Sequence, residues 1–146
     1  MSLGAVAANL TAVERRIAAA CARSGRRRDE VILGAVSKGH SAEALAAAVA
    51  AGHSRFGENR VQEGVAKAQQ LPASLEWHLL GPLQSNKVRA ALGTFTVLHA
   101  MDRAEILRAV EREDERQNRA VDVVLEVNVA GEGSKQGFAA TDLALP

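Results

Sequence analysis

The chain has 146 residues, 47% of them apolar, which fits one domain of ordinary size with a substantial core. Its 18 lysine and arginine residues nearly balance 17 aspartate and glutamate residues, so the formal net charge is +1. This balance argues against a dedicated nucleic-acid binder, which needs a basic excess to capture phosphates. No apolar stretch approaches the ~20 residues that span a bilayer, and the N-terminus does not resemble a signal peptide. We therefore expect a soluble cytoplasmic protein without membrane or nucleic-acid partners, which the single cysteine, Cys21, also fits.

The first segment has the pattern of an amphipathic helix, and strands and helices alternate after it. Its apolar stripe comprises Val6, Leu10, Val13, Ile17 and Cys21, and Gly25 is a plausible stop. The expected strands are 31–36, 55–59, 75–80, 95–100 and 121–129. The expected helices between them are 42–51, 61–70, 85–92 and a charged one from 102 to about 119.

Several residues are suited to the starts of these helices. Ser41 is expected to cap the helix that follows it, and Asp102 to open a capping-box variant. Ser85 is expected to cap the short helix 85–92, which would place Asn86 and Lys87 at a positive helix end that could bind an anion.

Strands that alternate with helices at this spacing predict right-handed crossovers and a parallel sheet. Runs such as 31–36 and 121–129 are apolar almost throughout, which is typical of strands buried on both faces. Two architectures remain open, a doubly wound sheet and part of a (β/α)8 barrel. In both of them, chemistry gathers at the carboxyl ends of the strands.

Lys38 directly follows the first apolar strand and is the most informative residue at these strand ends. Partial burial there would disfavour its charged form and lower its pKa. A neutral amine is the nucleophile that forms imines with aldehydes. The alternative is an ordinary rim lysine whose ammonium reaches solvent or pairs with Glu58.

The other polar residues at the strand ends support more than one interpretation. Asn59 could orient a ligand or cap the next helix. His78 and His99 could bind a ligand, or could be inward-facing histidines satisfied by the backbone. No metal-ligand spacing, phosphate-binding glycine loop or serine nucleophile motif is present.

Four segments of the chain closely resemble one known family, in that family's order and spacing. They are Ala35–Lys38, Phe56–Glu63, Glu76–Lys87 and Val127–Gly137. The family is that of the pyridoxal 5′-phosphate (PLP) homeostasis proteins, which are similar to the N-terminal barrel domain of alanine racemase.

The resemblance implies a fold-type III PLP barrel, a (β/α)8 TIM barrel, with the cofactor held as an imine (Schiff base) on Lys38. It also implies that Asn59 lies near the cofactor and that His78 and Lys135 line or border the same mouth. Members of this family are thought to carry and buffer PLP, a vitamin B6 form, and to pass it to apo PLP-dependent enzymes rather than to catalyse a reaction. The resemblance therefore implies no catalytic residue.

The resemblance also implies a longer chain than this one. Family members complete the eight-stranded barrel and bind the cofactor's phosphate with late strands, so we expect residues 1–146 to form a single incomplete domain, truncated after strand five. We accordingly expect weak PLP binding and self-association through bare strand edges. Two alternatives stay open: a racemase-type enzyme, although the chain lacks the tyrosine typical of one, and a remnant that binds nothing.

Overall fold

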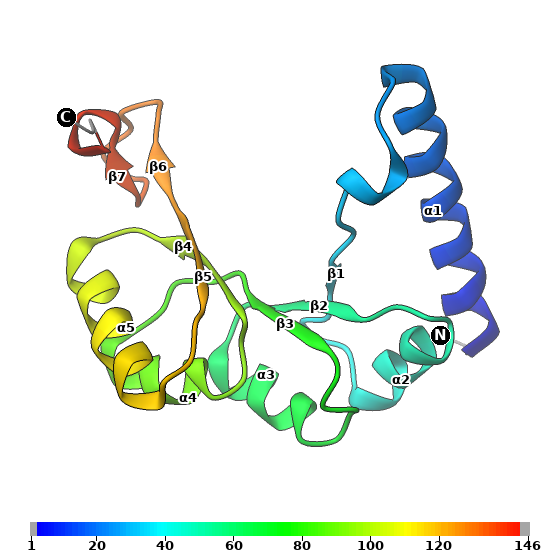
Figure 1. The fold of residues 1–146 in the computed structure, drawn as a ribbon, viewed down its shortest axis with the longest axis horizontal. Coiled ribbons are helices and arrows are strands. Elements are labelled where there is room, and N and C mark those ends of the chain that lie inside the picture. Colours follow the sequence, from blue (N-terminus) through cyan, green and yellow to red (C-terminus); the bar gives the residue numbers. More distant parts are fainter. Residues whose placement is uncertain (1–2, 144–146) are drawn as a thin grey trace.

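The computed structural model describes residues 3–143, and its architecture is a parallel α/β sheet (Figure 1). The helices are α1 Leu3–Ser24, α2 Ala42–Ala50, α3 Val61–Ala68, α4 Val88–Leu92 and α5 Ala104–Gln117. The strands are β1 Ala35–Val36, β2 Arg55–Glu58, β3 Glu76–Leu79, β4 Val97–Met101, β5 Asp122–Leu125, β6 Val127–Asn128 and β7 Phe138–Ala139. Three 3-10 turns complete the set, η1 Arg28–Glu30, η2 Ser85–Lys87 and η3 Ala140–Leu143.

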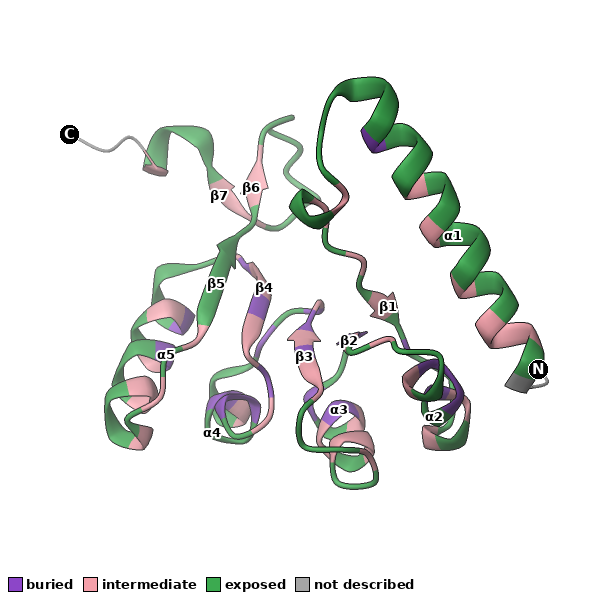
Figure 2. Ribbon diagram, turned by 45° about the vertical axis from the view of Figure 1, so that its right-hand side comes forward, coloured by how far each residue is buried: buried purple, intermediate pink, exposed green. Residues whose placement is uncertain are grey.

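Strands β1 to β5 form one sheet in sequence order, and every neighbouring pair is parallel. Helices α2 to α5 lie along one side of this sheet (Figure 2). The alternation of apolar strands and helices therefore predicted the topology correctly. Because all five strands run the same way, their carboxyl ends meet at one rim.

The core lies between the sheet and helices α2 to α5. Trp77 and Leu79 of β3 and Leu98 of β4 are buried there against helix residues such as Leu92 and Ile106. Side chains alternate between the two faces of a strand, so Glu76 and His78 of β3 lie on the opposite, helix-free face. This face carries the polar side chains that matter for the site.

Two predicted strands differ from those observed. The run 31–36 contributes only Ala35–Val36 to the sheet, and Ile32 is 62% exposed, because β1 is an edge strand paired with β2 alone. The run 121–129 is interrupted at Glu126, after which β6 pairs with β7 instead. All four residues of β5 are exposed, so the burial expected for this strand is wrong.

The helix starts were predicted in part. The Ser41 hydroxyl accepts a hydrogen bond from the Ala44 amide at 3.4 Å and caps α2 as expected. The Asp102 capping box is wrong, since Arg103 occupies the cap position and its guanidinium binds the Asp102 carboxylate. The predicted Ser85 cap is also wrong, because Ser85 opens η2 and α4 begins three residues later. Helix α4, with five residues, is too short for the anion site expected there.

Helix α1 packs beside α2 at the β1 edge rather than over the sheet (Figure 1). It ends at Ser24, and Gly25 follows with a φ of +69°, which confirms the predicted stop. Cys21 is buried, as its place on the apolar stripe predicted. Within residues 3–143, no helix combines the length and apolarity needed to cross a membrane.

Candidate functional site

Lys38 lies at the carboxyl end of β1, in the turn that leads to α2. Gly39 follows it with a φ of +75°, a left-handed conformation that glycine adopts without strain. The residue is exposed, so the partial burial expected from the sequence is wrong. Within the described part of the chain, no side-chain hydrogen bond or ion pair engages its amine, which is therefore accessible to a ligand.

Ser37, the residue before Lys38, is buried, and its amide, hydroxyl and carbonyl groups all form hydrogen bonds. Its amide donates to the Gly57 carbonyl at 2.9 Å, and its hydroxyl donates to a Glu58 carboxylate oxygen at 2.7 Å. Its carbonyl accepts from the Lys67 ammonium at 2.8 Å and from the His40 amide at 3.1 Å. The backbone that carries Lys38 is thus anchored one residue before the exposed amine.

Glu58 does not pair with Lys38, the partner that the rim-lysine alternative assigned to it. Its side chain is fully buried and forms an ion pair with Lys67 of α3, whose side chain is 12% exposed. The second carboxylate oxygen, Oε2, is buried and has no hydrogen-bond partner among the described residues. The role of Lys67 was not predicted from the sequence, although a carboxylate at the end of a buried strand signals that a cation should lie nearby.

Asn59 follows β2 at the same rim and is exposed. It does not cap α3, because Arg60 occupies the cap position and its side chain makes no capping bond. The register pairs Val36 with Gly57, and Lys38 and Asn59 each follow these paired residues by two positions. The Asn59 carbonyl also contacts Gly81 so closely that a Cβ on Gly81 would lie 2.3 Å from it. Lys38 and Asn59 therefore lie at the same rim, while the proximity of Asn59 to a cofactor stays a prediction.

His78 lies on the helix-free face and belongs to a chain of hydrogen bonds across three strands. The Arg55 guanidinium donates to Glu76 Oε2 at 2.7 Å, and Glu76 Oε1 is 2.9 Å from His78 Nε2. His78 Nδ1 is in turn 3.0 Å from His99 Nε2 of β4. The sequence singled out both histidines but predicted neither this pairing nor the part played by Glu76.

The pKa values of this hydrogen-bond chain are shifted. Burial acts to raise the pKa of Glu76, but hydrogen bonds from Arg55 and His78 outweigh it and the net pKa is lowered. Burial lowers the pKa of His99, and positive charge on His78 lowers it further. At neutral pH, Glu76 is therefore an anion and His99 a neutral imidazole.

Lys135 lies in the exposed loop between β6 and β7, beyond the β5 edge of the sheet. Its amide donates to the Glu132 carbonyl at 3.0 Å. Lys38 lies at the opposite, β1 edge, and no described contact joins the two lysines. The placement of Lys135 at the same mouth stays a prediction.

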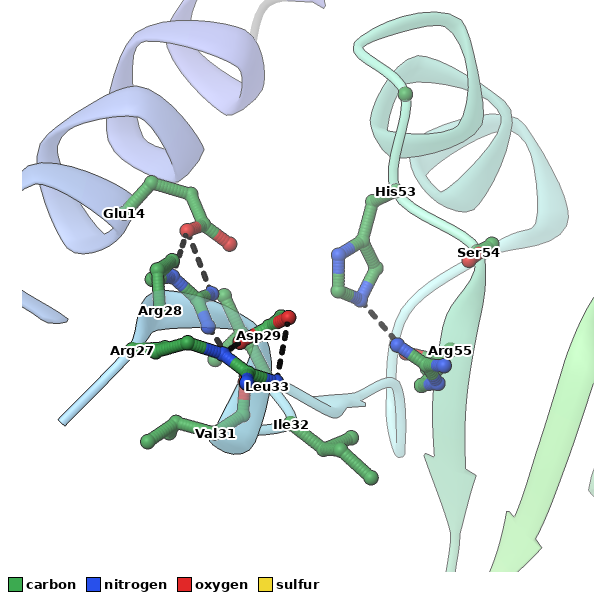
Figure 3. Close-up of a pocket in the computed structure, with 11 residues that line it drawn as sticks. Glu14, Arg27, Arg28, Asp29, Val31, Ile32, Leu33, His53, Ser54 and Arg55 are labelled. Carbon is green, nitrogen blue, oxygen red and sulfur yellow. Dashed lines mark hydrogen bonds and ion pairs between the residues drawn. The ribbon is translucent and has the colours of Figure 1, made fainter. Parts of the chain in front are cut away.

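A cavity of about 810 Å³ lies at the other end of the strands, around η1 and the start of β2 (Figure 3). Its charged groups bind one another: Arg27 pairs with Asp29, and Arg28 with Glu14. His53 Nε2 contacts the Arg55 carbonyl at 2.6 Å. Because these groups already have partners, the cavity does not compete with the rim as a ligand site.

An exposed amine and an amide thus lie at the carboxyl rim of a parallel sheet, which is where proteins of the α/β class carry their ligand sites. The chain belongs to the family described as "Alanine racemase, N-terminal domain", whose model matches residues 2–145. This confirms the resemblance from which the barrel fold was predicted and decides against the doubly wound sheet.

Curated relatives of this chain are named pyridoxal phosphate homeostasis protein. The one from Escherichia coli (strain K12) is 39% identical over 142 residues, covering 94% of this chain and 61% of the relative. The one from Haemophilus influenzae is 38% identical over 133 residues, covering 89% of this chain and 56% of the relative. The chain thus spans about three fifths of the length of these relatives.

Solved structures similar to this chain include PipY of Synechococcus elongatus PCC7942 with PLP bound. It superposes with a TM-score of 0.75 at 35% identity, covering 94% of this chain and 60% of PipY. A Bifidobacterium adolescentis protein of unknown function superposes with a TM-score of 0.83 at 32% identity, covering 92% of this chain and 59% of that protein. The chain thus spans about three fifths of the length of each of these structures.

Proposed function

We propose that this chain binds PLP through a reversible imine between the cofactor's aldehyde and the Lys38 amine, and that it serves PLP homeostasis. The proposal rests on the exposure of Lys38 and on the lack of bonding partners for its amine among the described residues. Its amine is exposed and unengaged at the carboxyl rim, while the preceding residue is buried and anchored by four hydrogen bonds. An accessible amine on a fixed backbone is what imine formation with an aldehyde needs.

Other polar residues of the chain are of types that can bind polar groups of this cofactor. Asn59, exposed at the same rim as Lys38, offers an amide that can donate to or accept from a polar group of PLP. His78 and His99 lie on the helix-free face of the same sheet, and Lys135 supplies a further cation on the loop after β6. We propose that these residues contact the cofactor, with Lys38 as its only covalent attachment.

An imine suits a carrier because it is covalent yet reversible by water or by another amine. The open rim leaves Lys38 within reach of such an amine, including one from an apo PLP-dependent enzyme. The name carried by the curated relatives, pyridoxal phosphate homeostasis protein, supports this role over a catalytic one. We also propose a cytoplasmic location, where such recipient enzymes would be encountered.

Absorbance titration tests the proposal directly. The chain of 146 residues is titrated with PLP and compared with its Lys38→Arg variant, which keeps the positive charge but forms no stable imine. We expect an imine band at high PLP concentration in the parent chain and no such band in the variant. Equal bands in both proteins would overturn the assignment of Lys38.

A further inference from the structure

The chain of hydrogen bonds from Glu76 to His99 determines which nitrogen of each imidazole carries a proton. A carboxylate only accepts hydrogen bonds, so the His78 nitrogen next to Glu76, Nε2, must be protonated. When His78 is neutral, its Nδ1 is then an acceptor, and His99 Nε2 must donate to it. The remaining nitrogen of His99, Nδ1, is left with a free lone pair, and no hydrogen bond to it is present among residues 3–143.

His99 also lies at an irregular point of its strand. The register between β4 and β5 shifts between Leu98 and Met101, and Ala100, inside this bulge, has a φ of +54°. A left-handed alanine is strained, and bulges of this kind re-aim side chains next to active sites. The bulge is therefore consistent with a functional orientation of His99.

The sheet register places His99 at the level of Lys38. Val36 is opposite Gly57, Gly57 is opposite His78, and His78 is opposite Val97. Two positions beyond Val36 and Gly57 lie Lys38 and Asn59, in the segments that follow β1 and β2, and two positions beyond Val97 lies His99, within β4. His99 is thus near the same rim as the candidate anchor, on the helix-free face, with β2 and β3 between its strand and β1.

We propose that His99 is a general base of this site, which removes a proton from the ammonium group of an amine that enters to displace Lys38. This inference rests on the proposed function. A protonated amine has no lone pair and cannot attack an imine, so the entering amine must first lose a proton. His99 Nδ1 takes that proton, its Nε2 proton passes to His78 Nδ1, and the amine is left neutral. The neutral amine then forms the new C=N bond as the C=N bond to Lys38 breaks, and its two remaining N–H protons go to the Lys38 nitrogen, which leaves as a free amine. The added charge then rests on His78, which becomes an imidazolium beside the Glu76 anion.

The charges around the two histidines favour the transfer of a proton from His99 to His78. The lowered pKa of His99 keeps it neutral and ready to accept a proton, and it disfavours leaving the charge on His99 itself. Glu76 stays ionised, because Arg55 binds its other oxygen at 2.7 Å. His78 and Glu76 therefore act as positioning residues, in the way that the carboxylate of a catalytic triad orients its histidine.

Histidine nitrogen NMR tests the geometry without any cofactor. In the 15N-histidine-labelled chain at neutral pH, we expect His99 to be protonated at Nε2 and not at Nδ1. Glu76→Gln should relax this preference, while exposed His40 serves as the internal control. A His99 that is protonated at Nδ1, or that shows an even mixture of tautomers, in the parent chain would overturn the inference.

Amine-driven release of PLP tests the chemistry. The PLP-loaded chain is mixed with ethylamine, which is protonated at neutral pH, or with methoxyamine, which is not, and the loss of the imine band is timed. In His99→Gln, whose amide can still donate to His78, we expect release by ethylamine to slow ~100-fold, with release by methoxyamine unchanged. Equal slowing with both amines, or no slowing with either, contradicts a general base. A parent chain that forms no imine on Lys38 overturns the proposed function, and this inference with it.

Discussion

The ammonium of Lys67 lies 2.8 Å from the carbonyl oxygen of Ser37, the residue immediately before Lys38. The same ammonium pairs with the fully buried Glu58, which also accepts the Ser37 hydroxyl at 2.7 Å. Helix α3 and strand β2 thus hold the end of β1 through one buried ion pair. Lys67 thus stabilises the backbone next to Lys38 but does not lie at the rim itself.

Removing Lys67 should therefore destabilise the fold. Lys67→Met leaves the Glu58 carboxylate buried without a cation, and we expect a loss of ~3 kcal/mol in the free energy of unfolding. Glu63→Gln, which breaks an exposed ion pair with Arg60 on the same helix, should change it by less than ~0.5 kcal/mol. Urea unfolding monitored by circular dichroism gives both values.

A double variant shows whether the loss of stability comes from the unpaired Glu58 charge or from a general failure to fold. Lys67→Met combined with Glu58→Met replaces both charges by apolar side chains of similar size, and we expect it to recover much of the lost stability. If the single Lys67→Met variant is as stable as the parent chain, the ion pair does not hold the end of β1.

Gly81 should matter because the backbone of Asn59 passes so close to it. A Cβ at Gly81 would lie 2.3 Å from the Asn59 carbonyl oxygen, so Gly81→Ala must displace the segment that carries Asn59. We expect a loss of ~1–3 kcal/mol in stability and weaker PLP binding, measured by urea unfolding and by absorbance titration. Gly34→Ala, which has nothing within 4 Å of the new Cβ, is the matched control. Equal effects of the two substitutions would remove the reason for assigning Gly81 this role.

The stability of the chain should fall on mild acidification, partly because of His99. Burial lowers the folded-state pKa of His99 below its ordinary value, so below about pH 6.5 the unfolded chain binds more protons at this residue than the folded chain. The contribution of His99 to the free energy of unfolding is therefore complete above that pH, and it is lost as the pH falls toward the folded-state pKa. We expect the urea midpoint of His99→Gln to decrease less than that of the parent chain between pH 7.5 and pH 5.5. Parallel decreases in the two proteins would show that His99 does not contribute.

The β5 edge of the sheet should promote self-association. Its apolar side chains Val123, Val124 and Leu125 are 37%, 46% and 40% exposed, and Val36 on the other edge strand is 51% exposed. Parallel strands with exposed apolar side chains at an edge invite pairing with another chain. We expect concentration-dependent association in sedimentation velocity, reduced by Val124→Lys. A parent chain that stays monomeric at all concentrations would contradict this expectation.

The sequence predicted the parallel sheet because each strand is an apolar run of the right length between helical segments. It predicted Lys38 and Asn59 together because each follows such a run, and parallel strands end at a common rim. It could not predict the exposure of Lys38, since the two-residue pairing of β1 with β2 depends on the sheet as a whole.

The contacts between side chains were the least predictable part of the site. Glu58 pairs with Lys67 rather than Lys38 because α3 returns across the end of β2, a packing detail that no local pattern encodes. The contact between His78 and His99 requires the register of β3 with β4, and the exposure of β5 requires knowing which strand is at the edge. Each of these is set by tertiary packing rather than by a residue's neighbours in sequence.

Borohydride trapping with peptide mass mapping identifies which lysine of the chain forms the imine with PLP. Sodium borohydride reduces an imine to a stable amine, so the modified lysine can be identified after proteolysis. The chain has lysines at positions 38, 67, 87 and 135, and we expect PLP on the peptide that contains Lys38, with little on the other three. Modification spread evenly over the lysines, or concentrated on one other than Lys38, would contradict the proposed attachment.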